Sequence, residues 1–267
     1  MTKYLSAFKI RFIETIQYRT AALAGIATQF AWGFMEIFAF AAFYRSSPDA
    51  FPMEFSQTVS YIWLQQAFLA LFMMWFWDKD IMSSVTEGGI AYELVRPVDL
   101  YGIWFSKSAA NRLARAALRC MPILLVAFIL PEPYRMSLPP NLFQFLLFVL
   151  STVLTVGVVV SFAMLVYVSI FYTMSGNGMR LFAAVLSDFL AGAIIPLPFF
   201  PEPFRRVAEL LPFAAGQNMP LRIYSGNIAG ADALKGILLQ VFWLVILVTL
   251  GRLAMRKALK RVVSHGG

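Results

Sequence analysis

The feature that most constrains this chain is a run of 31 uncharged, mostly apolar residues at positions 142–172. About 20 apolar residues are enough to cross the hydrocarbon core of a membrane, which is roughly 30 Å thick. As a helix the run would be roughly 46 Å long, because each residue adds about 1.5 Å. The run therefore predicts a membrane helix that tilts, bends near Gly157 or extends beyond the lipid.

The composition of the whole chain also indicates that lipid is its solvent. Of the 267 residues, 60% are hydrophobic and only 13% are charged, whereas about a quarter of an ordinary soluble domain is charged. This excludes an ordinary soluble enzyme and a disordered chain. The single cysteine, Cys120, excludes an intrachain disulfide, and the single histidine, His265, disfavours a His/Cys metal site. The first residues do not have the pattern of a removable signal peptide.

Six segments predict membrane spans, so the expected fold is an all-α polytopic membrane protein with one transmembrane domain over residues 1–267. The expected spans are residues 20–44, 59–77, 108–130, 142–172, 179–195 and 237–250. The second ends in an aromatic cluster that suits the headgroup region. The third is the least apolar, because only residues 120–130 of it are free of charge. We expect its three arginines, Arg112, Arg115 and Arg119, to snorkel outward to water.

The basic residues indicate how the chain is oriented. The net charge is +8, but Lys and Arg form no aromatic-interleaved patch, so no nucleic-acid partner is expected. With both termini in the cytoplasm, 16 of the 22 Lys and Arg residues fall on the cytoplasmic side and 6 on the outer side. Membrane proteins concentrate these residues in cytoplasmic loops, so we expect cytoplasmic N- and C-termini.

Residues 3–19 predict a separate helix that lies in the membrane interface. Apolar residues recur there every three or four positions, while charged residues occupy the other faces. The apolar stripe consists of Leu5, Phe8, Phe12 and Ile16. Such a helix lies at headgroup level and binds membrane lipids, partly through their negative charge. The alternative is that this segment extends the first span into water.

The sequence contains no recognisable catalytic constellation. It has no GxxxxGK[ST], HExxH, GxSxG or CxxC motif, so the chain is not expected to be an enzyme. Two acids, Glu36 and Asp188, lie inside expected spans. A charge in lipid costs about 2.5 kcal/mol or more, so each should face protein or a wet cavity. They are candidates for a cavity that binds a cationic or polar substrate, or alternatively for hydrogen bonds between helices.

Residues 79–100, between the second and third expected spans, have structure of their own. Gly88-Gly89 favours a helix end and Pro97 an extended exit, so the sequence predicts a short helix at 81–86 and a second short element at 91–95. This cytoplasmic segment is either a docking surface for a soluble partner or an ordinary solvated turn.

Residues 196–212 follow the fifth expected span and begin with four prolines in eight residues. No straight helix continues through such a stretch. It predicts a re-entrant or interfacial hairpin on the outer side, because broken backbone at membrane depth must be buried in protein or line a cavity.

With these elements in this order, the chain resembles the membrane subunits of type-2 ABC (ABC-2) exporters over essentially its whole length. The likeness rests on the interfacial helix, the six spans, the segment after the second span and the proline-broken hairpin. The stretch from Glu87-Gly88-Gly89 to Leu94-Val95-Arg96-Pro97 is similar to a bacterial subgroup of these permeases. The resemblance therefore also implies a bacterial inner-membrane location.

In such families a coupling helix between the second and third spans docks on a separate ATPase. The resemblance implies that residues 80–95 have this role, with Glu87, Glu93 and Arg96 as polar contacts. It implies an ATPase dimer that binds the ATP and Mg²⁺, a second permease of the same or a different sequence, and no cofactor on this chain. It also implies alternating access driven by the ATPase. The resemblance does not carry over a substrate class; the expected function is export of a small amphipathic molecule, drug, peptide or lipid.

The alternative function is a stand-alone transporter, channel or lipid scramblase that works without an ATPase. A secondary transporter often has related halves with matching broken helices, but only the segment after the fifth expected span is broken by prolines here. An intramembrane enzyme would require Glu36 and Asp188 to meet as a dyad. An ATPase that stays with the purified chain would distinguish the exporter from these alternatives.

Overall fold

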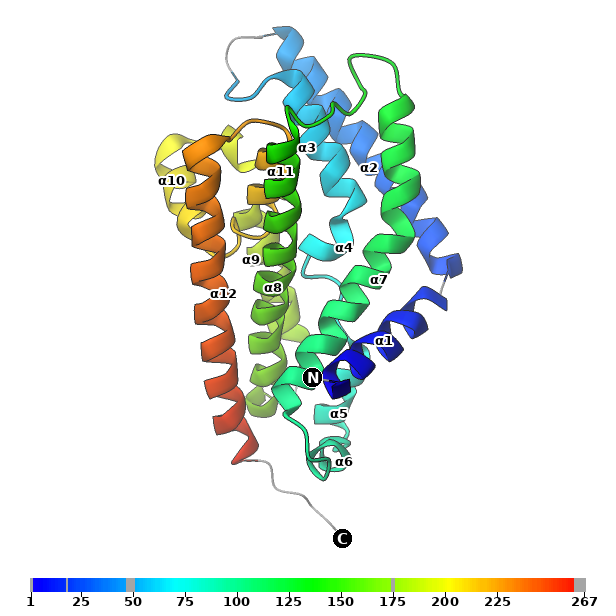
Figure 1. Ribbon diagram of the computed structural model, residues 1–267, viewed down its shortest axis with the longest axis vertical. Coiled ribbons are helices and arrows are strands. Elements are labelled where there is room, and N and C mark those ends of the chain that lie inside the picture. The colour runs from blue at the N-terminus through cyan, green and yellow to red at the C-terminus, as the bar shows by residue number, and fades with distance from the viewer. Residues whose placement is uncertain (1, 18, 47–50, 174–175, 262–267) are drawn as a thin grey trace.

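The computed structural model describes residues 2–17, 19–46, 51–173 and 176–261, and every regular element within them is helical. The helices form an elongated bundle with α5 and α6 at one end and α10 at the other, which we call the α6 end and the α10 end (Figure 1). In chain order they are α1 (Thr2–Gln17), α2 (Arg19–Ser46), α3 (Phe55–Ala67), α4 (Leu69–Phe72), α5 (Lys79–Thr86), α6 (Ile90–Leu94), α7 (Leu100–Ile129), α8 (Leu142–Thr173), α9 (Asn177–Ala191), η2 (Leu197–Phe199), α10 (Glu202–Leu210), α11 (Asn218–Tyr224) and α12 (Gly230–Leu259). The expected all-helical class is confirmed.

Three helices in the described part of the chain are long and apolar enough to cross a membrane. They are α8, α12 and residues Ala24–Ser46 of α2. They coincide with the expected spans 20–44, 142–172 and 237–250, although α12 begins seven residues earlier and ends nine residues later than expected. Large apolar side chains are exposed on all three helices, among them Trp32, Phe38, Phe143, Leu146, Leu238 and Phe242. An apolar surface of this extent matches lipid better than water.

Helix α8 contacts α12, α11, α7 and α5 and so connects much of the bundle (Figure 1). Gly157 permits a close approach of α12, because a Cβ atom there would lie 2.9 Å from the Leu244 side chain. Gln240 of α12 is fully buried in the same interface: it accepts a hydrogen bond from Ser151 (2.9 Å) and donates one to the carbonyl oxygen of Ala215 (2.7 Å). Small residues and buried amides of this kind hold helices together in lipid.

The expected second span, residues 59–77, is not a single continuous helix. Helix α3 ends at Ala67, Phe68 departs from helical geometry (φ −105°, ψ 17°), and α4 adds one turn before the chain becomes extended at Met73. Residues 58–67 are all buried, so α3 packs inside the protein instead of against lipid.

Arg112 of α7 supplies the physical reason for this break. Its side chain is fully buried, and Nη1 donates to the carbonyl oxygen of Met73 (2.7 Å) and lies 3.4 Å from the carbonyl oxygens of Ala70 and Leu71. Carbonyls at a helix end have no partner within the helix, and lipid offers none. The expectation that Arg112 snorkels to water is therefore wrong, because the broken backbone holds its guanidinium inside.

Two other expected spans differ from the structure at their ends. Helix α7 starts eight residues before the expected 108–130, because the Asp99 side chain accepts a hydrogen bond from the Gly102 N–H (3.0 Å) and caps the helix. Helix α9 ends at Ala191, four residues before the end of the expected 179–195, because the next residue, Gly192, has a left-handed φ of +75°. Its 15 residues span about 22 Å, which is shorter than a hydrocarbon core of roughly 30 Å.

The proline-rich segment after α9 contains η2 and α10, in agreement with the predicted hairpin at 196–212. The sequence did not predict the following helix, α11. Glutamine amides satisfy the irregular backbone where the hairpin begins: Gln65 Nε2 donates to the carbonyl oxygen of Ala193 (2.6 Å), and Gln217 Nε2 donates to that of Gly192 (3.4 Å). The start of the hairpin is thus buried in protein, as broken backbone in a membrane must be.

Helix α1 crosses α7 at an angle instead of continuing the line of α2 (Figure 1). This agrees with a separate N-terminal helix over 3–19. Of the predicted apolar stripe, Leu5 is exposed, whereas Phe8, Phe12 and Ile16 are half-buried. Ile10, which lies off that stripe, is exposed as well. Arg11, which lies off the apolar stripe, is mostly buried against the rest of the protein, and Thr15 is buried in the interface with α7.

Candidate functional site

Residues 79–98 form a protrusion at the α6 end, which we call the α5–α6 protrusion (Figure 1). Asp78 caps α5, since its carboxylate accepts hydrogen bonds from the backbone N–H groups of Asp80 (3.1 Å) and Ile81 (3.4 Å). Gly88, with a φ of +80°, allows the turn between α5 and α6. The helix α5 lies close to the predicted short helix at 81–86, and the second predicted element, at 91–95, is the helix α6.

Glu93 joins the protrusion to α7. Its Oε2 accepts a hydrogen bond from the indole N–H of the fully buried Trp104 (2.6 Å), and Lys107 Nζ lies 3.6 Å from its Oε1. Glu93 is one of the three predicted polar contacts for an ATPase, and the structure places its carboxylate against its own chain. A buried indole N–H needs such a partner, so Glu93 fixes the position of α6.

The tip of the protrusion is exposed and carries both apolar and charged groups. Glu87 and Arg96, the other two predicted contacts, are exposed. Between them Tyr92 is 79% and Val95 82% exposed. Tyr92 and Val95 were not among the predicted contacts, although large apolar residues three positions apart in a polar segment are a signal of a contact surface. Exposed apolar groups on a polar face are typical of protein–protein contacts.

Behind the protrusion lies the buried Asp78, which caps α5 and also contacts α1 and α8. Arg11 of α1 donates to it from Nε (3.0 Å) and Nη2 (2.5 Å), and the Asp78 N–H donates to the Tyr167 hydroxyl of α8 (2.8 Å). Arg11 also pairs with Glu14 (2.9 Å) and Asp80 (2.7 Å). Burial lowers the pKa of Arg11, but these carboxylates outweigh burial and raise the pKa above its usual value. We call Asp78, Arg11 and Tyr167 the Asp78 cluster.

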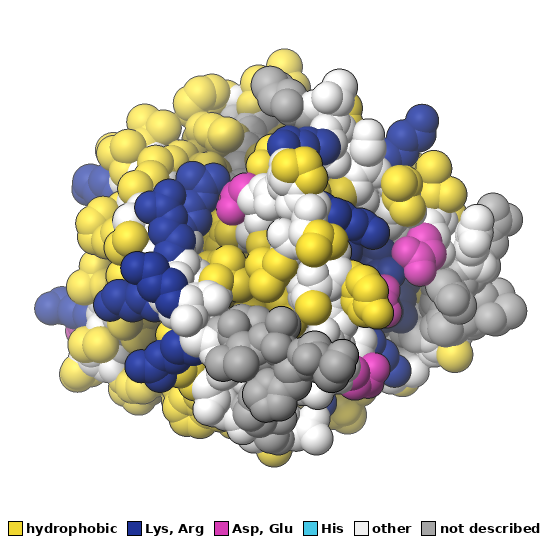
Figure 2. All heavy atoms as spheres, turned by 90° about the horizontal axis from the view of Figure 1, so that it is seen from below, with side chains coloured by type: hydrophobic (Ala, Val, Ile, Leu, Met, Phe, Trp, Pro, Cys, Tyr) yellow, Lys and Arg dark blue, Asp and Glu magenta, His cyan; other side chains and the backbone are white. Residues whose placement is uncertain are grey.

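Basic side chains gather at the end of the bundle that carries the protrusion. Figure 2 looks onto this end and shows Lys and Arg side chains in several groups, with fewer acids between them and apolar side chains around the edge. The α6 end is therefore the basic face of the protein.

Toward the α10 end, a pocket of about 700 Å³ lies between α2 and η2. Aromatic residues form much of its wall; they are Phe40, Phe43, Phe51, Phe199 and Phe200. Among the residues that line it, Glu36 alone carries a charge, and its carboxyl contacts the Gln66 side chain. We call this the Glu36 pocket. An aromatic wall with one carboxylate suits a cationic amphiphile, since ring faces and the carboxylate both attract positive charge.

Asp188, the second acid inside an expected span, has different surroundings. Its Oδ2 accepts a hydrogen bond from the Trp75 indole N–H (2.5 Å), and its buried Oδ1 has no hydrogen-bond partner among the described residues. Asp188 does not line the Glu36 pocket. The two acids therefore contact different partners, and the Asp188 contact fits the alternative of a hydrogen bond between segments.

Comparison with known proteins agrees with this architecture. The model of the family described as ABC-2 family transporter protein matches residues 30–266. The match includes the α5–α6 protrusion and the Glu36 pocket, whereas α1 lies outside it. A search of curated proteins gives no match to this chain. Since the family model covers most of the sequence, the chain belongs to the ABC-2 family of transporter proteins, whose members are in general the non-catalytic membrane components of their transporters.

Proposed function

We propose that this chain is the permease subunit of an ATP-driven exporter. Two permeases, of the same or different sequence, assemble with a dimer of a separate ATPase that binds ATP and Mg²⁺. Membership of the ABC-2 family supports this proposal. The observation that carries it is the α5–α6 protrusion, which Glu93 and the Asp78 cluster anchor inside the protein while its tip stays exposed. A closing ATPase that pushes on this tip moves α1, α7 and α8 together.

The proposed topology has six crossings, with both termini in the cytoplasm of a bacterial inner membrane. Helices α2, α8 and α12 supply three crossings. Helix α7, the broken pair α3–α4, and α9 with its hairpin supply the others, since buried polar side chains satisfy their breaks. The basic α6 end faces the cytoplasm, because Lys and Arg concentrate on that side of membrane proteins (Figure 2).

Placing charge on the tip of the protrusion tests the contact with the ATPase. The double substitution Tyr92→Asp, Val95→Asp is expected to reduce the ATPase that co-purifies with the tagged chain by about tenfold or more, because central aromatic and aliphatic contacts dominate such interfaces. The tagged chain is purified from its native host, and the retained subunit is identified by its phosphate-loop sequence and by ATP hydrolysis.

The matched control is Leu138→Asp, which changes an equally exposed apolar residue (76%) in the α7–α8 loop at the α10 end. It should leave the amount of ATPase unchanged. An ATPase that remains fully bound to the double variant would contradict the proposed contact. A wild-type chain that never retains an ATPase would count against the exporter and favour a stand-alone transporter, channel or scramblase.

We further propose that the Glu36 pocket contacts the exported substrate, an amphipathic cation. Tetraphenylphosphonium serves as the probe, and stimulation of ATP hydrolysis by the assembled complex is the measurement. Glu36→Gln is expected to raise the half-stimulating concentration about tenfold, because a contact between a cation and a desolvated carboxylate contributes roughly 1–2 kcal/mol. Asp188→Asn should leave that concentration unchanged, since Trp75 engages this carboxylate. An unchanged Glu36→Gln response would exclude this role for Glu36.

A further inference from the structure

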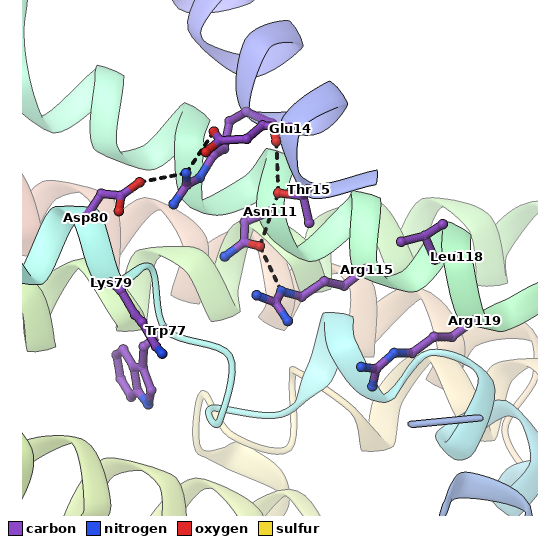
Figure 3. A pocket seen from close by; sticks show the side chains of 10 residues that line it. Glu14, Thr15, Trp77, Lys79, Asp80, Asn111, Arg115, Leu118 and Arg119 are labelled. Carbon is purple, nitrogen blue, oxygen red and sulfur yellow. Dashed lines mark hydrogen bonds and ion pairs between the residues drawn. The ribbon is translucent and has the colours of Figure 1, made fainter. Parts of the chain in front are cut away.

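A second pocket, of about 400 Å³, lies at the α6 end between α1, α7 and the loop that leads into α5 (Figure 3). The exposed tip residues Tyr92 and Val95 do not line it. Four basic residues do; they are Arg11, Lys79, Arg115 and Arg119. Neither the ATPase contact nor the Glu36 pocket accounts for this concentration of positive charge.

Arg11 is already neutralised by residues of the chain. Its guanidinium contacts the carboxylates of Glu14, Asp78 and Asp80 at 2.9, 2.5 and 2.7 Å. Glu14 and Asp80 are also the two acids that line the pocket, and both are bonded to Arg11 (Figure 3). Both acidic residues that line this pocket are therefore paired with Arg11.

Arg115 and Arg119 lie one helical turn apart on α7 and have no carboxylate partner within the described residues. Arg115 donates from Nε to Asn111 Oδ1 (2.8 Å), which leaves its two Nη groups available. The Nε of Arg119 is buried and has no hydrogen-bond partner among the described residues. The guanidinium groups of Arg115 and Arg119 lie 5.4 and 5.5 Å, respectively, from the centre of the Phe76 ring. Like charges four residues apart on a helix repel each other, so this arrangement favours a bound anion.

A phosphate group matches these donors better than a single carboxylate does. Guanidinium groups bind phosphate through two parallel N–H···O bonds, and a phosphate has enough oxygens for two arginines at once. Lys79, which is exposed at the rim, adds a further positive charge. Trp77 and Leu118 give the pocket an apolar side, which suits a headgroup that continues into an acyl chain.

The position of the pocket agrees with this ligand. Helix α1, which forms one wall, exposes Leu5, Ile10 and Ile13 as an interfacial helix does. The pocket therefore lies at headgroup level on the basic face of a membrane protein, and basic pockets in such positions bind anionic headgroups. We propose that Arg115 and Arg119, with Lys79 at the rim, bind a phosphate group, carried either by an anionic lipid or by a soluble phosphate compound.

Titration of the detergent-solubilised full chain with phosphatidylglycerol tests this proposal. Phosphatidylglycerol is expected to bind about tenfold or more tightly than phosphatidylcholine, whose phosphate is balanced by choline. The double substitution Arg115→Gln, Arg119→Gln should weaken the binding of phosphatidylglycerol by about tenfold or more, because two charge-assisted contacts are lost. Inorganic phosphate is the second probe: if it binds through the same arginines at least as tightly as phosphatidylglycerol, the ligand is a soluble phosphate, and if phosphatidylglycerol binds more tightly, it is the lipid.

Arg252→Gln is the matched control, because it also removes a guanidinium that lies over an aromatic ring, at 5.7 Å from the centre of Tyr101. It should leave the affinity for phosphatidylglycerol unchanged. Where the double variant fails to fold, Arg119→Gln alone decides the test, since the buried Nε of Arg119 has no hydrogen-bond partner within the described residues. Equal affinity for the two lipids together with no phosphate binding, or wild-type affinity in the arginine variants, would overturn the proposal.

Discussion

Replacement of Arg112 by methionine is expected to lower the melting temperature of the purified protein by roughly 10 °C. Methionine fills a similar volume but donates no hydrogen bond. It leaves the carbonyl oxygen of Met73, and those of Ala70 and Leu71 beside it, without the Arg112 partner in the protein interior. Each unpaired buried group costs about 1–3 kcal/mol, so the free energy of unfolding should fall by about 3–5 kcal/mol.

The measurement is thermal unfolding in detergent, followed by tryptophan fluorescence or by size-exclusion chromatography. Arg256→Met is the control, since Arg256 is an arginine on the long helix α12 but is exposed, and its loss should cost less than about 0.5 kcal/mol. A variant Arg112→Met that is as stable as the wild type would show that burying the charge costs as much as its hydrogen bonds contribute. It would contradict the role of Arg112 at the break between α3 and α4.

Local signals in the sequence were sufficient for much of the fold. Residues 142–172 are apolar throughout, so α8 could be placed within a residue of its observed ends. Gly88 and the flanking residues of 79–100 predicted a short helix and a second short element, because a left-handed glycine ends a helix regardless of tertiary contacts. Four closely spaced prolines likewise predicted the broken segment after α9. In each case the residues that carry the sequence signal are the same residues that form the element or the break.

The break after α3 depends on a residue far away in the sequence and could not be predicted in the same way. Residues 59–77 are apolar enough to suggest a span, and the acceptors at their broken end are satisfied by Arg112, about 40 positions later. Read by itself, an arginine in an expected span suggests snorkelling to water. Only the packing of α7 against α4 shows that its partners are backbone carbonyls inside the protein.

The candidate site was predicted in part, for a similar reason. Glu87 and Arg96 are exposed on the protrusion, as a contact surface requires. Glu93 has the same side chain as Glu87, but its carboxylate accepts a hydrogen bond from the Trp104 indole N–H of α7 and so does not face outward. Asp78 was missed because its role depends on Arg11 and Tyr167, which are distant in the sequence. Its position directly before a short helix was the one local signal.

Replacement of Asp78 by alanine is expected to release the α5–α6 protrusion from α1 and to uncouple ATP hydrolysis from transport. The substitution removes the cap of α5, which costs about 1 kcal/mol. It also leaves the mostly buried Arg11 without its bidentate partner, which adds about 3 kcal/mol. The purified complex should hydrolyse ATP without stimulation by substrate, and its melting temperature should fall by roughly 10 °C.

Asp80→Ala is the matched control, because Asp80 also pairs with Arg11, at 2.7 Å, but is 68% exposed whereas Asp78 is 1% exposed. An exposed ion pair contributes less than about 1 kcal/mol, so this variant should keep both stability and stimulation. The double variant Arg11→Met, Asp78→Ala should recover part of the stability lost in Asp78→Ala, since no buried charge is then left unpaired. If Asp78→Ala and Asp80→Ala lose equal stability, or if Asp78→Ala remains fully stimulated by substrate, the Asp78 cluster does not position the protrusion.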